Sequence, residues 1–231
     1  MKPIYKPKGA AAEYGDYALN IYTGCPHRCY YCFAPQVLHR DREAFHSCVE
    51  PCKNIVEETR KQLERDETLR GKLIHLCFLC DPYPTGYDTT ITRQIIQLLK
   101  GYGNHVQILT KGDGSRDFDL MDGKDWYGVT ISGGDCESQE PGAIPEWERV
   151  VIMKGAPCRK WISFEPVIHP GYVFVLLSSI DESVRVKIGK LNYHKSDIDW
   201  AKFGRAAEEI CIVRGLDYYI KDSLRTEMEK E

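Results

Sequence analysis

The sequence predicts an α/β fold whose strands form a parallel sheet, arranged as a partial barrel or as an open wound sheet. Three observations predict it. Short apolar runs alternate with helical patterns, runs such as "LIHLCFL" fit strands buried on both faces, and six such units are too few for a closed eight-stranded barrel. With 231 residues, of which 42% are hydrophobic and 28% charged, the chain is expected to form one globular domain over residues 1–231.

Each expected strand is a short apolar run. In chain order they are Ala18–Thr23, Leu73–Leu79, His105–Thr110, Trp126–Ser132, Lys160–Phe164 and Val184–Gly189. Apolar residues at helical spacing predict helices between them, at Pro51–Arg70, Thr89–Tyr102 and Ser196–Arg214. Strands joined by helical crossovers run parallel, and ligands then gather at the carboxyl ends of the strands.

Composition narrows the classes of function. The net charge of −3 argues against binding to duplex DNA, and no apolar run is long enough to cross a membrane. The first residues contain lysines but no apolar signal segment, so we expect a cytoplasmic protein. Its ten cysteines are then expected to be reduced thiols or metal ligands, with Cys136, Cys158 and Cys211 as small apolar packing residues.

Three cysteines crowd the loop after the first expected strand. Cys25, Cys29 and Cys32 have the spacing C-x3-C-x2-C, and Gly24 permits a tight bend before them. Three thiolates can bind three irons of a 4Fe–4S cluster and leave the fourth iron open to another ligand. Soft thiolates suit zinc as well as iron–sulfur clusters, so we expect residues 24–33 to form a loop that binds one or the other at the carboxyl end of the sheet.

The motif "GCPHRCYYC" resembles the cluster loop of radical S-adenosylmethionine (radical SAM) enzymes, in which an aromatic residue precedes the last cysteine. Four further segments resemble the spore photoproduct lyase-like branch of this superfamily: "CDPYPTGYDTTITRQIIQLL", "ILTKGDGSRDFDLM", "VTISGG" and "ISFEPVIHPG". The resemblance implies a partial (β/α)6 TIM-type barrel. It also implies two cofactors, a 4Fe–4S cluster and S-adenosylmethionine, and a low-potential electron donor such as flavodoxin or ferredoxin.

The resemblance also assigns roles by position. Cys25, Cys29 and Cys32 would bind the cluster. The residues expected to contact S-adenosylmethionine are Tyr31, Cys80, Asp81, Lys111, Ser132 and Glu165. Among them, Lys111 would pair with the methionine carboxylate, and Glu165 would contact a ribose or the substrate. Cys80 stands where the lyases have serine, so its polar contact with the cofactor is an open point.

Cys80 has a second expected role. A thiol S–H bond is weak enough to donate hydrogen to a substrate radical, and Cys80 lies at the expected carboxyl end of the second strand. Side chains alternate along a strand, so Cys77 and Cys80 are expected to face opposite sides. Packing is the alternative role for both thiols.

Several alternatives stay open. Glycyl-radical activases have a similar loop and length and act on a partner protein, but they carry Gly-Gly-Glu-Pro where this chain has "CDPYP". A zinc-stabilised binding module is the non-enzyme alternative, because Cys29 and Cys32 with Cys48 and Cys52 approach zinc-ribbon spacing. Cys48 and Cys52 could also form a redox pair. The substrate, and any protein that helps to recognise it, cannot be read from the sequence.

Overall fold

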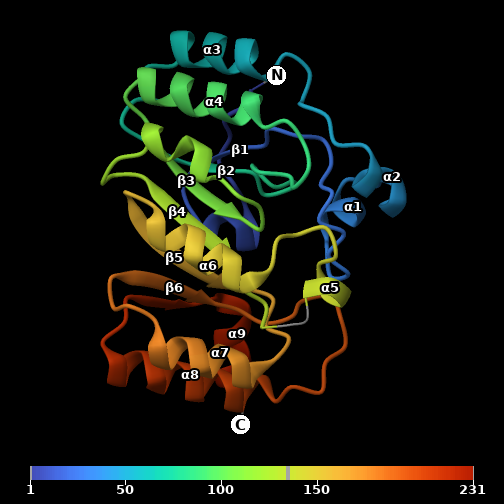
Figure 1. Ribbon diagram of the computed structural model, residues 1–231, viewed down its shortest axis with the longest axis vertical. Helices are drawn as coiled ribbons and strands as arrows, with labels where there is room; N and C mark the ends of the chain where they lie inside the picture. The colour runs from blue at the N-terminus through green and yellow to red at the C-terminus, as the bar shows by residue number, and fades with distance from the viewer. Residues whose placement is uncertain (1, 134–135, 231) are drawn as a thin grey trace.

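A computed structural model describes residues 2–133 and 136–230; Gly134, in the motif "VTISGG", lies outside them. In this part of the chain, one parallel sheet has its strands in chain order, and it curls into a half-barrel (Figure 1). The strands are Tyr17–Leu19 (β1), Leu73–Leu76 (β2), His105–Thr110 (β3), Trp126–Thr130 (β4), Arg159–Phe164 (β5), Val184–Ile188 (β6) and Tyr218–Ile220 (β7). The predicted partial barrel with a parallel sheet is confirmed.

The helices fall into two groups. Figure 1 shows the longer ones along the outside of the sheet, and α1, α2 and α5 together beside the carboxyl ends of the strands. The α-helices are Ala34–Val37 (α1), Arg42–Ser47 (α2), Ile55–Arg65 (α3), Thr90–Gly101 (α4), Cys136–Gln139 (α5), Glu146–Gly155 (α6), Pro170–Ser179 (α7), Trp200–Arg214 (α8) and Asp222–Met228 (α9). Two 3-10 helices are Gly9–Glu13 (η1) and Ser115–Leu120 (η2).

The structure corrects three expected elements. The seventh strand, β7, was not expected. The helix predicted from Pro51 begins instead at Ile55, after Asn54 with φ +56°, while Pro51 forms an isolated antiparallel bridge with Tyr22. The second strand ends at Leu76, because the next residue has φ +69° and leaves the extended conformation.

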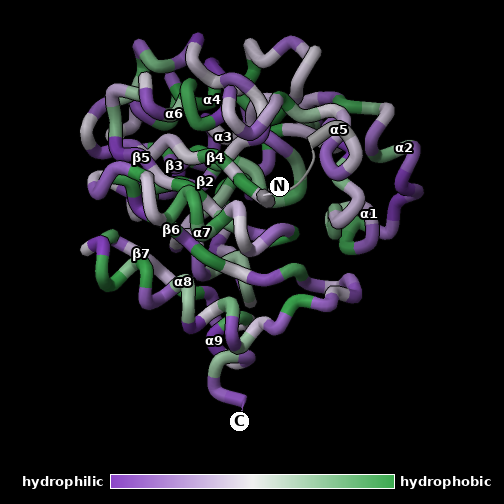
Figure 2. The backbone as a smooth tube through the Cα atoms, turned by 60° about the horizontal axis from the view of Figure 1, so that its bottom comes forward, coloured by the Kyte–Doolittle hydropathy of each residue, from purple (hydrophilic) through white to green (hydrophobic). Residues whose placement is uncertain are grey.

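The core lies between the sheet and its outer helices. Ile74, Ile108, Val129, Ile162 and Val186 come from five neighbouring strands and are fully buried. Figure 2 shows hydrophobic stretches concentrated along the central strands, whereas α2 at the side is largely hydrophilic. No helix in the described ranges is both long and apolar enough to cross a membrane.

The concave face of the half-barrel is filled by the N-terminal segment, which we define as residues 9–15. Tyr14 of this segment has its ring 5.7 Å from that of His75 on β2 and 5.9 Å from that of Trp161 on β5. The neighbouring Glu13 accepts a hydrogen bond from Tyr219 on β7 at 3.2 Å. The N-terminal segment therefore spans the concave face from β2 to the last strand.

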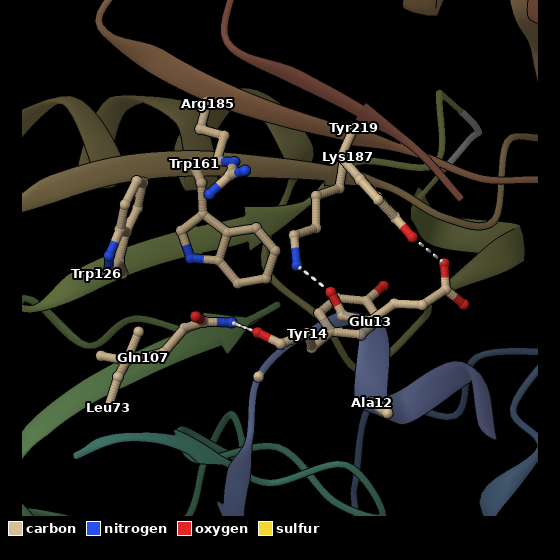
Figure 3. Close-up of a pocket in the computed structure, with 11 residues that line it drawn as sticks. Ala12, Glu13, Tyr14, Leu73, Gln107, Trp126, Trp161, Arg185, Lys187 and Tyr219 are labelled. Carbon is tan, nitrogen blue, oxygen red and sulfur yellow. Dashed lines mark hydrogen bonds between the residues drawn. The ribbon is translucent and has the colours of Figure 1, made fainter. Parts of the chain in front are cut away.

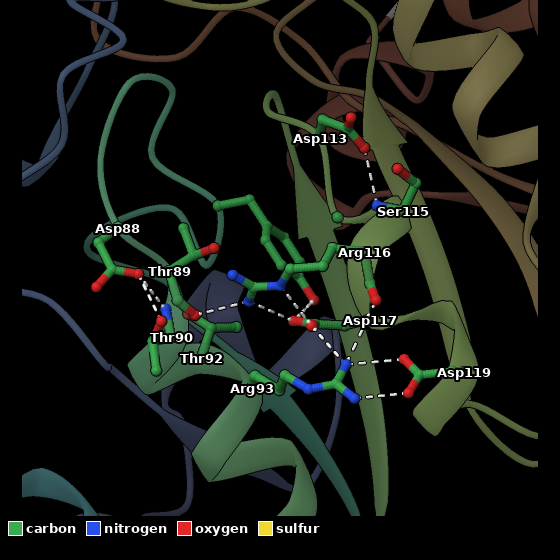
Figure 4. Close-up of polar contacts among 12 residues, drawn as sticks. Asp88, Thr89, Thr90, Thr92, Arg93, Asp113, Ser115, Arg116, Asp117 and Asp119 are labelled. Carbon is green, nitrogen blue, oxygen red and sulfur yellow. Dashed lines mark hydrogen bonds and ion pairs between the residues drawn. The ribbon is translucent and has the colours of Figure 1, made fainter.

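A buried carboxylate fastens the loop after β2 to η2 (Figure 4). Asp117 is fully buried, and its carboxylate lies 3.1 Å from Arg93 and 2.9 Å from Arg116. It also accepts a hydrogen bond from the Tyr83 hydroxyl at 3.1 Å. Two cations and a phenol satisfy this carboxylate, so the Arg-Asp pair in "GSRDF" has a structural role.

Candidate active site

The cysteine loop, residues 24–33, follows β1 and packs against α2. Cys25 N donates to Phe45 O at 3.3 Å, and His46 Nδ1 donates to Cys25 O at 2.8 Å. A Cβ added to Gly24 would lie under 3.0 Å from Phe45 O, a distance that real Cβ atoms do not adopt. The close approach of loop and helix therefore requires glycine at position 24.

Arg42 holds the second half of the loop. Its guanidinium donates to the carbonyl oxygens of Cys29, Tyr30 and Cys32, the last two at 2.8 and 3.2 Å. Two of the sulfurs interact with backbone N–H groups. The N–H of His27 is directed at the Cys25 sulfur, and the N–H of Ala34 is directed at the Cys32 sulfur. N–H groups directed at cysteine sulfur stabilise thiolates and tune iron–sulfur clusters.

One zinc ion and a 4Fe–4S cluster need different distances between their cysteine sulfurs. Three thiolates on one zinc ion would lie about 3.8 Å apart, given Zn–S bonds of about 2.3 Å. In the described part of the chain, the one group of three potential ligands within 4.8 Å of one another is His105, Asp122 and Asp125, so the three loop sulfurs are not all within that distance of one another. Each cysteine of a 4Fe–4S cluster binds a different iron, so a cluster needs a wider sulfur spacing than one zinc ion does. Three soft thiolate donors in one loop suit a 4Fe–4S cluster by their chemistry.

Burial controls the protonation of these thiols. It raises the pKa of Cys29 to about 12 and holds the pKa of Cys25 well above its usual range. Both are therefore thiols at neutral pH when no metal is bound. Metal binding must displace their protons, because a thiolate is the ligand form.

Lys111 and Tyr31 meet at a buried carboxylate. The Tyr31 hydroxyl donates to Glu140, and Lys111 Nζ lies 4.0 Å from the same oxygen and 5.6 Å from the centre of the Tyr31 ring. Arg149 pairs with the second oxygen of Glu140. Burial outweighs the attraction of Arg149 and raises the pKa of Glu140 to about 7. The structure thus brings Lys111 from the end of β3 to the cysteine loop.

Glu140 and Arg149 were not found from the sequence. Glu140 lies in the turn "QEPGAI" and Arg149 on α6, and neither segment has the regular apolar periodicity of the predicted elements. The turn reaches the cysteine loop through Gly142 N, which donates to His27 O at 3.1 Å. No local pattern signals that a carboxylate in such a turn becomes buried.

Asp81 supports the backbone beneath Lys111. Its carboxylate accepts hydrogen bonds from Tyr83 N at 2.8 Å, Thr110 Oγ1 at 2.5 Å and Lys111 N at 2.9 Å. His27 Nδ1 lies 3.4 Å away. Because these donors surround both oxygens, Asp81 positions the end of β3, and a direct contact with a cofactor stays a prediction.

Ser132 is also engaged. Its backbone N and its hydroxyl both donate to Glu146 Oε1, at 2.6 and 2.8 Å. Gly133 N donates to the same oxygen at 3.1 Å. Because the Ser132 hydroxyl donates its hydrogen to Glu146, it can only accept a hydrogen bond from a ligand.

Glu165, at the end of β5, forms an ion pair with Lys221 Nζ at 2.8 Å. It accepts a hydrogen bond from the Tyr14 hydroxyl at 2.6 Å and lies 3.3 Å from Asn192 Nδ2. The structure thus shows the ion pair that a strand-end glutamate often makes. The role expected for Glu165 toward a ribose or substrate stays a prediction.

The expectation that Cys77 and Cys80 face opposite sides loses its basis, because it assumed that the second strand continues as far as Cys80. β2 ends before Cys77, so strand alternation no longer applies there, and the two thiols lie close enough for their charges to interact. Cys52 lies close enough to Cys80 for their charges to interact, although burial is the main cause that raises the pKa of Cys52 to about 11. Cys48 is exposed. Cys52 therefore lies near the end of β2, and the sulfurs of the zinc alternative are not gathered within 4.8 Å.

The fold and the site together define a partial (β/α) barrel with a three-thiol loop at the carboxyl ends of its strands. No family model and no curated protein matches the chain. Among solved structures, it is similar to a substituted variant of spore photoproduct lyase with bound S-adenosylmethionine and a dinucleoside spore photoproduct. The TM-score is 0.62 at 16% sequence identity, and the match covers 88% of this chain and 63% of that chain. The expected resemblance is confirmed for the fold, over less than two thirds of the lyase chain.

Proposed function

We propose that the protein is a radical SAM enzyme of the lyase-like branch. It would cleave S-adenosylmethionine reductively to methionine and a 5′-deoxyadenosyl radical, which abstracts hydrogen from a substrate. The observation that carries this proposal is the meeting of three thiols, Tyr31 and Lys111 at the carboxyl ends of a half-barrel. The lyase with the same fold contains S-adenosylmethionine, which supports a site for this cofactor here.

The chain's own residues have distinct tasks in this proposal. Cys25, Cys29 and Cys32 would hold a 4Fe–4S cluster, which when bound supplies one low-potential electron to the sulfonium. Lys111, whose ammonium lies over the Tyr31 ring, would bind the methionine carboxylate and give up its 4.0 Å contact with Glu140. A carboxylate buried among protein groups needs such a cation. The partly buried loop would keep water away from the reacting bond.

The test separates the cluster loop from the other cysteines. Cys25, Cys29 and Cys32 are replaced together by Ala in one variant, and Cys48 and Cys52 in a matched control. After anaerobic reconstitution with iron and sulfide, the first variant should lose the brown colour and bound iron, and the control should keep both. Cluster loss in the control alone would show that the site has been misread.

The hydrogen-donor role of Cys80 stays a proposal, supported by its place in the loop after β2 and its interaction with Cys77. A second thiol beside the donor can share the radical left on it. Cys80→Ala should still cleave S-adenosylmethionine but give substrate product that is not reduced. An unchanged product distribution would assign Cys80 to packing.

Two further parts of the proposal concern partners. Flavodoxin or ferredoxin would supply the electron in the cytoplasm, and a partner protein would either supply or form the substrate if the enzyme is an activase. The "CDPYP" segment favours a lyase-like function over an activase function.

The net charge of −3 disfavours duplex DNA as the substrate. Reduction of the reconstituted cluster by reduced flavodoxin, which is oxidised by one electron, tests the electron donor and is followed as loss of the cluster's visible absorbance.

A further inference from the structure

A cavity of about 330 Å³ opens at the amino-terminal end of the half-barrel (Figure 3). Leu73 and Trp126, which begin β2 and β4, line it, whereas the cysteine loop follows the end of β1. The cavity therefore lies at the opposite end of the strands from the candidate active site. Its volume is within the range of small-molecule sites, about 300 to 1,000 Å³.

A buried cation faces this cavity. Lys187 of β6 is 7% exposed, and its Nζ donates to the backbone oxygen of Glu13 at 2.8 Å. The same ammonium lies 4.5 Å from the centre of the Tyr14 ring and 5.4 Å from that of Trp161. In the described ranges no carboxylate lies within 4.0 Å of Lys187. An ammonium has three donors, and the carboxylates of Glu13 and Glu165 act on its charge only from beyond ion-pair distance. A ligand anion in direct contact would therefore stabilise this buried cation.

A second cation from the same strand lines the cavity. Arg185 has its guanidinium 5.8 Å from the centre of the Trp126 ring. Its Nε lies 3.5 Å from Asp217 but is buried without a hydrogen bond. This leaves Arg185 with donor capacity for a ligand.

The one acidic lining residue is already paired. Glu13 Oε2 accepts hydrogen bonds from the Tyr219 hydroxyl at 3.2 Å and from Asp222 N at 3.1 Å. Its other oxygen lies 3.8 Å from Lys221. The cavity lining thus contains two cations, Arg185 and Lys187, and one carboxylate that other groups already bind, while Asp217 lies beside Arg185 outside the lining.

Aromatic rings give the cavity its shape. Trp126 is half-buried, Trp161 and Tyr14 lie further in, and Figure 3 shows the Arg185 and Lys187 side chains beside Trp161, with Trp126 on the other side of that ring. Flat rings beside two cations suit a flat anion better than a spherical or branched one. We propose that this cavity binds a small aromatic carboxylate, held by Arg185 and Lys187 against Trp126. The proposal does not rest on the function proposed above.

Calorimetric titration of the full-length reconstituted protein with benzoate tests this site. Binding to one site is expected, with a dissociation constant below about 1 mM. Arg185→Gln should weaken it about tenfold or more, because a charge-assisted contact is lost. Arg159→Gln is the matched control: Arg159 lies 5.4 Å from the same Trp126 ring but does not line the cavity. Its affinity should stay within about twofold of wild type.

Absence of benzoate binding up to about 10 mM, or equal losses in the two arginine variants, would overturn the proposal. Lys187→Met, which keeps an unbranched side chain one atom shorter and removes its charge, should weaken benzoate binding as well. Two further probes test the aromatic part. Cyclohexanecarboxylate and inorganic phosphate should bind more weakly than benzoate, and equal affinity for either would refute an aromatic carboxylate as the ligand class.

Discussion

Asp81→Asn tests whether a single carboxylate organises the carboxyl ends of β2 and β3. Asp81 is 7% exposed and accepts hydrogen bonds on both oxygens. An asparagine could keep its carbonyl oxygen toward Tyr83 N and Thr110 Oγ1. Its NH2 group would then face Lys111 N, which donates to Asp81 Oδ2 at 2.9 Å. Two donors would oppose each other in a buried site.

A third donor adds to this conflict. Thr85 N donates to His27 Nε2 at 3.3 Å, so that nitrogen carries no proton and Nδ1 carries it toward Asp81. Burial lowers the pKa of His27 to about 4, which keeps the ring neutral at pH 7 and in this tautomer. Losing one hydrogen bond to a charged acceptor costs about 1.5–3 kcal/mol, and an unsatisfied buried donor costs about 1–3 kcal/mol more. The expected loss of unfolding free energy is therefore about 3–5 kcal/mol.

Urea unfolding at pH 7 under reducing conditions measures this loss. The matched control is Asp113→Asn, because Asp113 is exposed and its carboxylate accepts one local hydrogen bond, from Ser115 N at 2.8 Å. The control should cost under about 1 kcal/mol. A similar small cost for Asp81→Asn would refute the view that this carboxylate holds the strand ends together.

Two further predictions concern lysines. Lys111→Ala should weaken S-adenosylmethionine binding by about 30- to 1,000-fold, because a charge-assisted contact worth about 2–4 kcal/mol is lost. Calorimetry on reconstituted protein measures this affinity, and Lys124→Ala, at an exposed position, is the control. Wild-type affinity in Lys111→Ala would contradict the role of Lys111. Burial lowers the pKa of Lys187 from 10.5 to about 8. Between these pH values the unfolded chain binds more protons at this residue than the folded chain does, so Lys187 makes the free energy of unfolding rise with pH. Lys187→Met should therefore have a higher free energy of unfolding than wild type at pH 7. Unfolding titrations above pH 8 should show this advantage shrinking by up to about 1.4 kcal/mol per pH unit. An advantage that does not change with pH would contradict the burial of a charged ammonium.

The sequence was sufficient for the features that depend on local periodicity. Apolar runs located six strands, and the one at His105–Thr110 agrees with the structure to the residue. β7 was missed because Tyr218–Ile220 has three residues and two of them are only partly buried, so it lacks the long apolar run that identifies a central strand. The start of α3 was misplaced because proline suits the first turn of a helix but also fits an extended bridge.

Features that depend on contacts between distant segments could not be predicted in this way. The burial of Glu140 depends on Arg149, which is its partner, and on Tyr31, which is 109 residues away. Cys77 and Cys80 were assigned to opposite faces because the positive φ of Cys77 has no signature in a run as apolar as "LIHLCFL". The cysteine spacing, by contrast, identified the loop directly, since its ligands are adjacent in sequence.

The N-terminal segment has a consequence for the order in which the chain can fold. Its contacts with the last strand and helix join residues 206 and 209 positions apart, and its contact with Glu165 joins residues 151 apart. A ribosome synthesises this segment before its partners, so Glu13 and Tyr14 must wait until β7 and the start of α9 have been made. Closing loops of this length is slow, and we expect the concave face to be completed late, after the helices and neighbouring strands have paired. Until then, the cationic side chains of β6 stay open to water, and an incomplete chain exposes them.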